Sequence, residues 1–242
     1  MFSIQEPRKL DRFMVFGERR SGTNAVEAFL AANTSLMATS EFGWKHGVPS
    51  YPVLPRRCLF VVVVRDAFDW LSSFYRAPFE TPNAIADLPF PDFLRAAWRS
   101  NFLRAGGGWS KQGYRLHFKI APREELQLDR HPLTGASMEN VVALRTMKLH
   151  GHLSLLTRGI NAVVIRYEDF CTDPEALLRA VAEHFALDLP ETIEPIEGYV
   201  GPRYGRPRKL ETIGFSQEDR NFVLGHLDLR LEAMCGYHYP TT

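Results

Sequence analysis

The sequence GERRSGTN, at 17–24, follows directly on an apolar run at 13–16. Two glycines separated by four residues and followed by a hydroxyl residue have the outline of a phosphate-binding loop, G-x-x-x-x-G-K-[ST]. The lysine of that pattern is missing, because the second glycine is followed at once by Thr23, and Arg19 and Arg20 stand inside the loop instead. The stretch therefore predicts an anion site that works without the usual lysine.

Four segments around this loop have the composition of buried parallel strands. They are 13–16, a weaker segment that ends near Trp44, 59–64 and 162–166. The third, LFVVVV, is rich in β-branched residues without polar alternation, as expected of a strand covered by helices on both faces. Helical patterns separate the strands, so the sequence predicts an α/β fold. We expect three layers, with a mostly parallel central sheet, helices on both faces and a P-loop-type phosphate site at the glycine loop.

The helical patterns carry capping signals that predict where each helix begins. The first pattern covers 24–32, directly after the glycine loop. The second has Asp173 as its expected cap and Pro174 at its first helical position. A third begins with a capping box at Ser216 and can be closed by Gly236.

The length of 242 residues suits one domain. The α/β rhythm is interrupted at 78–135, where four prolines come close together and three glycines follow at 106–108. We therefore expect a single domain over 1–242, with an insertion or lid at about 78–135.

Bulk composition narrows the class of protein. A net charge of +1 and a pI of about 7.8 argue against a nucleic-acid partner, because nucleic-acid binders usually carry a basic patch. The cysteines, Cys58, Cys171 and Cys235, form no C-x-x-C pair, which indicates a reducing compartment and no metal site. The longest apolar run, 58–64, is far shorter than the roughly 20 residues of a membrane span. Charges at 1–13 argue against a signal peptide, so we expect a soluble cytoplasmic protein.

A second motif, RDAFDWLSSFYR, begins where the third predicted strand ends. Arg65 stands at the strand end and Ser73 follows eight residues later. Because open α/β sheets bind ligands at the carboxyl ends of their strands, the two side chains can hold a second phosphate together. The alternative is a surface ion pair of Arg65 with Asp66 and a solvated serine.

Together the two stretches resemble the sulfotransferase family that uses 3′-phosphoadenosine 5′-phosphosulfate (PAPS). The positions similar to that family's 5′-phosphosulfate loop are Arg19, Arg20, Ser21, Gly22, Thr23 and Asn24. Arg65 and Ser73 are similar to its 3′-phosphate motif, and the stretch at 163–185 and the closing LEAMCGY are similar as well. The resemblance does not cover 78–135. It implies transfer of a sulfuryl group from PAPS to a hydroxyl or amine of an unidentified acceptor, without a metal.

The sequence departs from the family pattern at three places. The family usually has a lysine where Arg20 stands; arginine keeps the charge but cannot give up a proton. The tryptophan that stacks on adenine in many members is replaced by Ala25. The C-terminal R-K-G phosphate clamp is not recognisable, although Arg203 and Arg208, in the basic stretch at 201–210, can replace it; the alternative is a solvated basic loop.

Proton removal from the acceptor needs a base. The stretch at 44–47, Trp-Lys-His-Gly, is similar to the family's K-T-H stretch, whose histidine takes that proton. The resemblance therefore implies that His46 is the catalytic base, a role that suits a neutral imidazole. Glu41 and Glu18 are the reserve candidates, and Arg20 is expected to stabilise charge on the leaving phosphate.

Two other polar groups receive a structural interpretation. Arg145, Lys148 and His152 share a face of the helix predicted after Ser137, and we interpret them as a solvated basic face, the alternative being an acceptor-site wall. The sequence Tyr-Glu-Asp at 167–169 is interpreted as a capped strand end and not as a magnesium ligand set.

Two other functions compete with the sulfotransferase interpretation. One is a kinase or NTPase-like protein with a degenerate P-loop, and the other is a non-catalytic binder of phosphorylated nucleotides. The acceptor of a sulfotransferase could be a sugar, a lipid, another small molecule or a peptide. The sequence predicts neither the acceptor nor the oligomeric state.

Overall fold

The computed structural model describes residues 1–3, 9–103, 125–196, 198 and 213–240. By the contacts between its Cα atoms the chain divides into two units. The first unit comprises Met1–Trp70 and Gly151–Arg206, and the second comprises Leu71–His150 and Pro207–Thr242. The single domain with an insertion at 78–135 stays a prediction.

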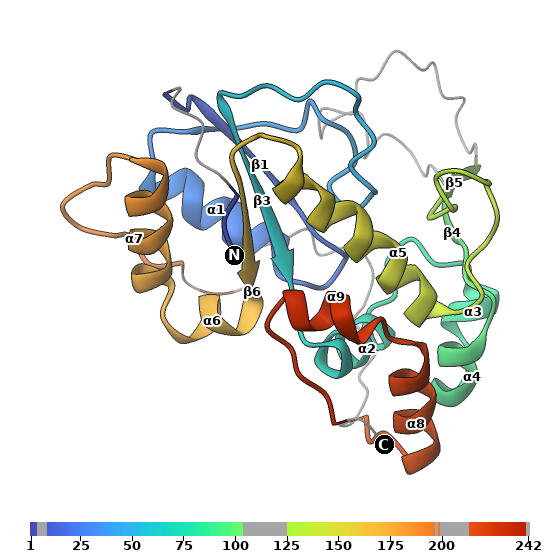
Figure 1. The fold of residues 1–242 in the computed structure, drawn as a ribbon. Coiled ribbons are helices and arrows are strands. Elements are labelled where there is room, and N and C mark those ends of the chain that lie inside the picture. Colours follow the sequence, from blue (N-terminus) through green and yellow to red (C-terminus); the bar gives the residue numbers. More distant parts are fainter. Residues whose placement is uncertain (4–8, 104–124, 197, 199–212, 241–242) are drawn as a thin grey trace. The chain divides into compact units, whose positions relative to one another are not determined.

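A four-stranded, all-parallel sheet organises the first unit (Figure 1). Its strands are β1 (Arg12–Phe16), β2 (Met37–Ala38), β3 (Cys58–Val64) and β6 (Ala162–Arg166), in the order β2-β1-β3-β6. All of β3 is buried, as its unbroken apolar sequence predicts. The α/β class, the parallel sheet and three of the four predicted strands are confirmed.

The second predicted strand is wrong in position. The strand β2 has only two residues, both exposed, and it ends well before Trp44. Gly43 adopts a positive φ of 97°, and the Gly47 amide donates to the Trp44 carbonyl at 2.8 Å. The residues at 41–47 therefore form turns and do not extend the strand.

Three helices pack on one face of this sheet. They are α1 (Thr23–Asn33), α6 (Tyr167–Thr172) and α7 (Pro174–Phe185). The Asp173 carboxylate accepts from the Ala176 amide, so the predicted cap of α7 and its first-turn proline are confirmed. Their apolar side chains share one core with those of the strands, and α1 and α7 lie on the same side of the sheet in Figure 1. This core contains Val26, Phe29, Leu30, Phe170, Leu178, Val181 and Phe185 from the helices and Phe13, Val15, Leu59, Val61, Val63, Val163 and Ile165 from the strands.

Other segments contact the opposite face of the sheet. Phe42 packs edge-on against Phe60, with 5.4 Å between ring centroids, and His152 lies 6.2 Å from Phe16. His152 is part of α5 (Val141–Leu153), which a short 3-10 helix, Ser154–Thr157, follows. The unit boundary passes through α5 and through α2 (Ala67–Arg76).

The second unit is built from short elements around an aromatic core. Its further elements are α3 (Asn83–Ala86), α4 (Phe90–Arg95), β4 (Ser100–Leu103), β5 (Glu125–Leu128), α8 (Gln217–His226) and α9 (Leu229–Met234), with β4 and β5 antiparallel. Phe74, Phe93 and Trp98 are fully buried and pack with centroid distances of 5.3 to 6.2 Å. The predicted cap at Ser216 is confirmed, because its side chain accepts from the Asp219 amide, and Gly236 follows the last helix with a positive φ of 85°. The single helix expected between them is wrong, because Asp228 accepts from two amides and caps a second helix.

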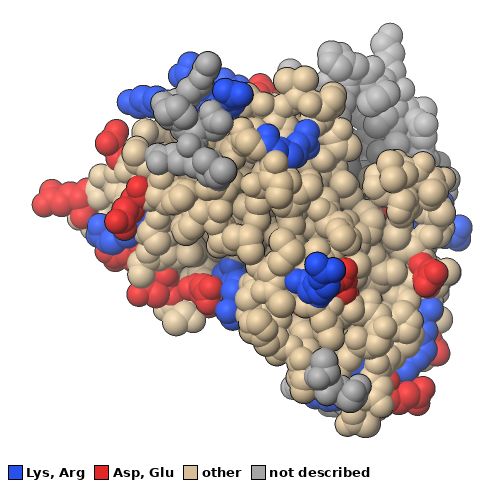
Figure 2. Space-filling view, in the orientation of Figure 1, with Lys and Arg blue, Asp and Glu red and all other residues tan. Residues whose placement is uncertain are grey.

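Charged side chains of both signs are intermixed on the first unit. Figure 2 shows them over the helices at the left of the view, where α6 and α7 lie. Arg179 pairs there with Glu175 at 2.7 Å. Within the described ranges, no helix is long and apolar enough to cross a membrane.

The start of α8 offers a pH test of stability. Asp219, whose side chain is 4% exposed, accepts from Arg95 Nη1 and from Ser216 Oγ, both at 2.7 Å. Burial alone would raise the pKa of Asp219, but these hydrogen bonds hold it below its ordinary value. The stabilisation that the ionised Asp219 side chain provides is therefore complete above about pH 4, and it is lost as the pH falls through the lowered pKa of Asp219 in the folded protein.

We expect Asp219→Asn to lower the free energy of unfolding at pH 7 by about 1–3 kcal/mol, because a buried, charge-assisted hydrogen bond is lost. Urea titrations between pH 3 and pH 7 should show a smaller acid-induced loss of stability in the variant. Glu218→Gln is the matched control, because Glu218 contacts the same arginine at 3.4 Å but is 87% exposed. Equal effects of the two substitutions would contradict this explanation.

Candidate functional site

The loop between β1 and α1 contains two glycines that the structure requires. A Cβ on Gly17 would lie 2.5 Å from the Val63 carbonyl oxygen of the neighbouring strand. Gly22 has a φ of 92°, and a Cβ there would overlap the ring of Tyr167. The glycine spacing read from the sequence thus corresponds to two points where the backbone approaches other parts of the first unit closely.

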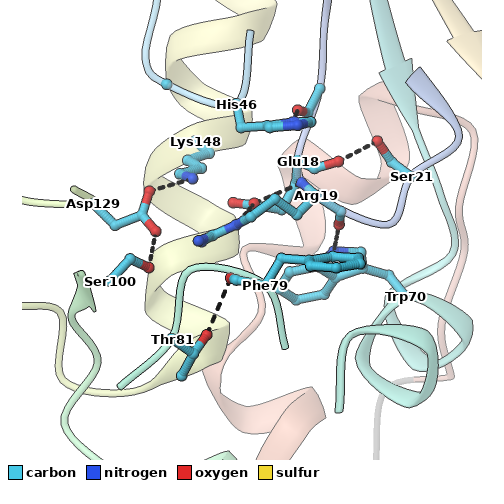
Figure 3. A network of polar contacts seen from close by, with 12 residues as sticks. Glu18, Arg19, Ser21, His46, Trp70, Phe79, Thr81, Ser100, Asp129 and Lys148 are labelled. Atoms are coloured by element: carbon cyan, nitrogen blue, oxygen red, sulfur yellow. Dashed lines mark hydrogen bonds and ion pairs between the residues drawn. The ribbon is translucent and has the colours of Figure 1, made fainter. Parts of the chain in front are cut away.

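Two charged residues of this loop are buried against each other. Glu18 and Arg19 are 7% and 2% exposed, and Glu18 Oε1 accepts from both Arg19 N, at 2.7 Å, and Arg19 Nε, at 2.9 Å. The Arg19 carbonyl accepts from Trp70 Nε1 at 2.8 Å, and Ser21 Oγ donates to the Glu18 carbonyl at 2.6 Å (Figure 3). The Arg19 guanidinium also lies 5.5 Å from the centre of the Trp44 ring. These contacts favour a structural role for Arg19 and for Glu18.

Arg20 and Arg65 come together at the ends of the strands. Arg20 has a φ of 69°, and its carbonyl accepts from Arg65 Nη1 at 3.3 Å. The Arg65 guanidinium lies 5.0 Å from the centre of the Tyr167 ring. Burial and the neighbouring Cys171 raise the pKa of the Tyr167 phenol, while the charges of Arg65 and Arg20 lower it in part. Both cations therefore act on the same place beside the glycine loop.

Helix α1 begins directly at this place. The amides of Thr23 and Asn24 belong to its first turn, where the helix geometry provides no intrahelical acceptors and the macrodipole is positive. Lys45 Nζ reaches the same turn, where it donates to Asn24 Oδ1 and to Glu27 Oε2. The arrangement can attract an anion through two arginines and the helix terminus, whereas the charge of Lys45 is compensated by Glu27.

His46 is attached to the glycine loop by its ring. His46 Nδ1 lies 2.7 Å from the Gly17 carbonyl oxygen, and the Gly17 amide donates to the Lys45 carbonyl at 3.0 Å. Because a carbonyl oxygen only accepts, Nδ1 carries the proton, and in the neutral ring the lone pair is on Nε2. The structure thus brings the predicted base to the predicted loop.

Arg145, Lys148 and His152 do not form a solvated basic face, and that interpretation is wrong. All three are buried, being 4%, 1% and 2% exposed. In the second unit, Arg145 binds both carboxylate oxygens of Glu232, at 2.6 and 2.8 Å, and Lys148 pairs with Asp129 (Figure 3). Each side chain finds its partner far away in the sequence, which helical spacing cannot reveal.

His152 of the first unit lies beside the turn at 44–47, whereas the sequence placed it on a solvated basic face, with an acceptor-site wall as the alternative. Its Nε2 lies 3.0 Å from the Gly47 carbonyl oxygen. The sequence signal was its position on the predicted helix face that it shares with Arg145 and Lys148. Tyr167 and Trp70, the partners of Gly22 and Arg19, likewise carried no sequence signal for their contacts with the loop.

Other predicted site residues lie elsewhere. Glu41 is 64% exposed and pairs with Arg12 at the start of β1. The glycine loop follows the other end of this strand, roughly 16 Å away, so the structure does not bring Glu41 to the site. Ser73 is 3% exposed and belongs to the second unit, so its joint site with Arg65 stays a prediction. Arg203 and Arg208 lie outside the described residues.

Residues 167–169 form the first turn of α6, directly after β6, so they are not the strand end that the sequence predicted, although Glu168 does make a structural contact. Glu168 Oε1 accepts from the Asp66 amide at 2.9 Å, and Asp66 in turn caps α2 by accepting from the amides of Phe68 and Asp69. In the part of the chain that the structure describes, no group of three or more His, Cys, Asp or Glu side chains is close enough to hold a metal ion.

We expect Gly22→Ala to destabilise the protein by about 1–3 kcal/mol, because the substitution combines a positive φ with an overlap on Tyr167. Gly159→Ala is the matched control, since Gly159 has a φ of 65° but no atom within 4 Å of an added Cβ. Urea denaturation of both variants measures the difference, which should vanish in a Tyr167→Ala background. Equal losses of stability in the two single variants would show that the ring does not constrain this position.

The chain was compared with protein-family models, with curated proteins and with solved structures. None of these comparisons finds a match. The loop, the two arginines and the anchored histidine are therefore the features from which a function can be inferred.

Proposed function

We propose that this protein is a PAPS-dependent sulfotransferase whose site lies at the loop between β1 and α1. The observation that carries the proposal is the hydrogen bond from His46 Nδ1 to the Gly17 carbonyl, at 2.7 Å. It attaches a histidine with a basic Nε2 to the same loop that opens α1. A base and an anion site next to each other are what transfer of a group from an anionic donor to a hydroxyl or amine needs.

The residues present fit a phosphosulfate donor. A Cβ on Gly22 would overlap the Tyr167 ring, so only glycine lets this ring lie against the loop. The amides of Thr23 and Asn24 belong to the first turn of α1, which is suited to bind an anion. Arg20 and Arg65 supply positive charge beside it, and arginine can donate two parallel hydrogen bonds to a phosphate. When bound, PAPS supplies a sulfuryl group attached to a phosphate that leaves.

His46 would accept the acceptor's proton at Nε2. The Gly17 carbonyl keeps Nδ1–H in place before and after this transfer, because both the neutral and the doubly protonated ring can donate from Nδ1. Arg20, together with the helix terminus, would stabilise negative charge on the leaving phosphate. Since Arg19 is paired with Glu18, Arg20 is the loop arginine best suited to that task.

The proposal includes finer points of fold and location. We place the chain in a three-layer α/β fold with helices on both faces of the sheet and a P-loop-type phosphate site. A cytoplasmic location agrees with the cysteines, all of which are free. Burial raises the pKa of the Cys58 and Cys235 thiols to about 12, so neither is suited to act as a nucleophile.

Ligand binding separates this proposal from a kinase-like protein. We expect 3′-phosphoadenosine 5′-phosphate to raise the melting temperature more than ATP with magnesium does, because a ligand of the folded state stabilises it by mass action. Arg65→Ala should weaken this nucleotide by about 10- to 150-fold and affect an analogue without the 3′-phosphate much less. Arg179→Ala removes an exposed arginine of α7 and is the matched control. Stronger stabilisation by ATP with magnesium would favour the kinase-like alternative.

Turnover separates the proposal from a non-catalytic nucleotide binder. With an acceptor found by screening with labelled PAPS, His46→Ala should lower kcat by about 10²- to 10⁴-fold, the usual loss for a positioned general base. The affinity for 3′-phosphoadenosine 5′-phosphate should change little. His238→Ala, at an exposed position, is the control; a His46 variant that keeps most of the activity would refute the assignment.

A further inference from the structure

We infer that His152 is a positioning residue for His46. The inference rests on the proposed function, because it concerns the orientation of the proposed base. It assigns to His152 the task of holding the turn at 44–47 through the Gly47 carbonyl, so that the His46 ring stays against Gly17.

The contact of His152 with the turn is buried and directional. His152 is 2% exposed, and its Nε2 lies 3.0 Å from the Gly47 carbonyl oxygen. Because the carbonyl can only accept, Nε2 carries the proton and Nδ1 has the lone pair in the neutral ring. The ring also lies 6.2 Å from Phe16, the residue directly before Gly17. One side chain therefore contacts both segments that have to be held together.

The turn connects this contact to His46. The Gly47 amide donates to the Trp44 carbonyl at 2.8 Å, which closes the turn around Lys45 and His46. At its other side, His46 donates to the Gly17 carbonyl and the Lys45 carbonyl accepts from Gly17. Each histidine thus donates to a backbone carbonyl. His152 Nε2 donates to Gly47 in the turn, and His46 Nδ1, which belongs to the turn, donates to Gly17. Loss of the first hydrogen bond would leave a carbonyl without its donor and loosen the turn.

Helix α5, which carries His152, packs closely against the segment that directly follows the turn at 44–47. A Cβ on Gly151 would lie 2.6 Å from Val48 Cγ1 and 3.2 Å from Val48 Cβ. Arg158, after the same helix, donates to the carbonyls of Pro49 and Tyr51. The end of α5 and the segment that follows it therefore fix 47–51 as well as the turn.

This arrangement predicts an effect on catalysis beyond stability. A base has to lie within hydrogen-bonding reach of its proton, and a displacement of about 1 Å can cost 10²-fold in rate. His152 does not have to touch the acceptor for such an effect. It acts by limiting the orientations of His46.

The test compares His152→Leu, which has no donor, with His152→Gln, whose amide nitrogen can replace Nε2. Nitrogen-15 NMR of the His46 ring reports its Nδ1–H tautomer without any substrate. We expect His152→Leu to reduce the population of this tautomer and to lower kcat by about 10- to 100-fold, with unchanged affinity for 3′-phosphoadenosine 5′-phosphate. His152→Gln should restore the tautomer and most of kcat. An unchanged His46 signal in His152→Leu, or no recovery in His152→Gln, would overturn the inference.

A second variant keeps the test decisive if His152→Leu does not fold. Gly151→Ala leaves His152 in place but pushes against Val48, so it should also shift the His46 signal; an unchanged signal would count against the inference. The failure of the proposed function can be told apart from the failure of this inference. If no acceptor is sulfated but the tautomer of His46 responds to His152, the positioning role stands and the proposed reaction does not.

Discussion

The candidate site depends on the close approach of Gly17 to the neighbouring strand. The parallel register of β1 and β3 places the Val63 carbonyl where a side chain on Gly17 would have to lie. With no side chain in the way, the amide and the carbonyl of Gly17 both bind the segment at 44–47, at 3.0 and 2.7 Å. One residue thus determines where the loop begins and where the histidine lies.

The charges around the loop divide into two groups. Glu18 and Arg19 are buried and compensate each other, because a buried arginine without its carboxylate would be costly. Arg20 and Arg65 lie at the strand ends beside Tyr167, where both charges act on the phenol. The first group shapes the loop, and the second supplies the positive charge that the proposed donor needs.

Buried ion pairs also organise the second unit. Arg145 and Glu232 connect α5 with α9, and the carboxylate outweighs the effect of burial so that the pKa of Arg145 lies above its ordinary value. Lys148 pairs with Asp129, which has a φ of 54° and also accepts from Ser100 (Figure 3). Pairs of this kind add little net stability, but a buried arginine or lysine restricts the fold to packing arrangements that place a carboxylate beside it.

Local sequence patterns were sufficient to predict the α/β class, the strands β1, β3 and β6, the glycine loop before α1 and the cap of α7, because each follows from local periodicity or from neighbouring residues. Three other features depend on tertiary contacts: the turn at 44–47 binds Gly17, Glu41 pairs with Arg12, and His152 is buried. Those contacts join residues 28 or more positions apart, and their hydrogen bonds depend on how the sheet brings segments together. A local pattern contains no information about such partners, whereas it is sufficient to place a strand or a helix cap.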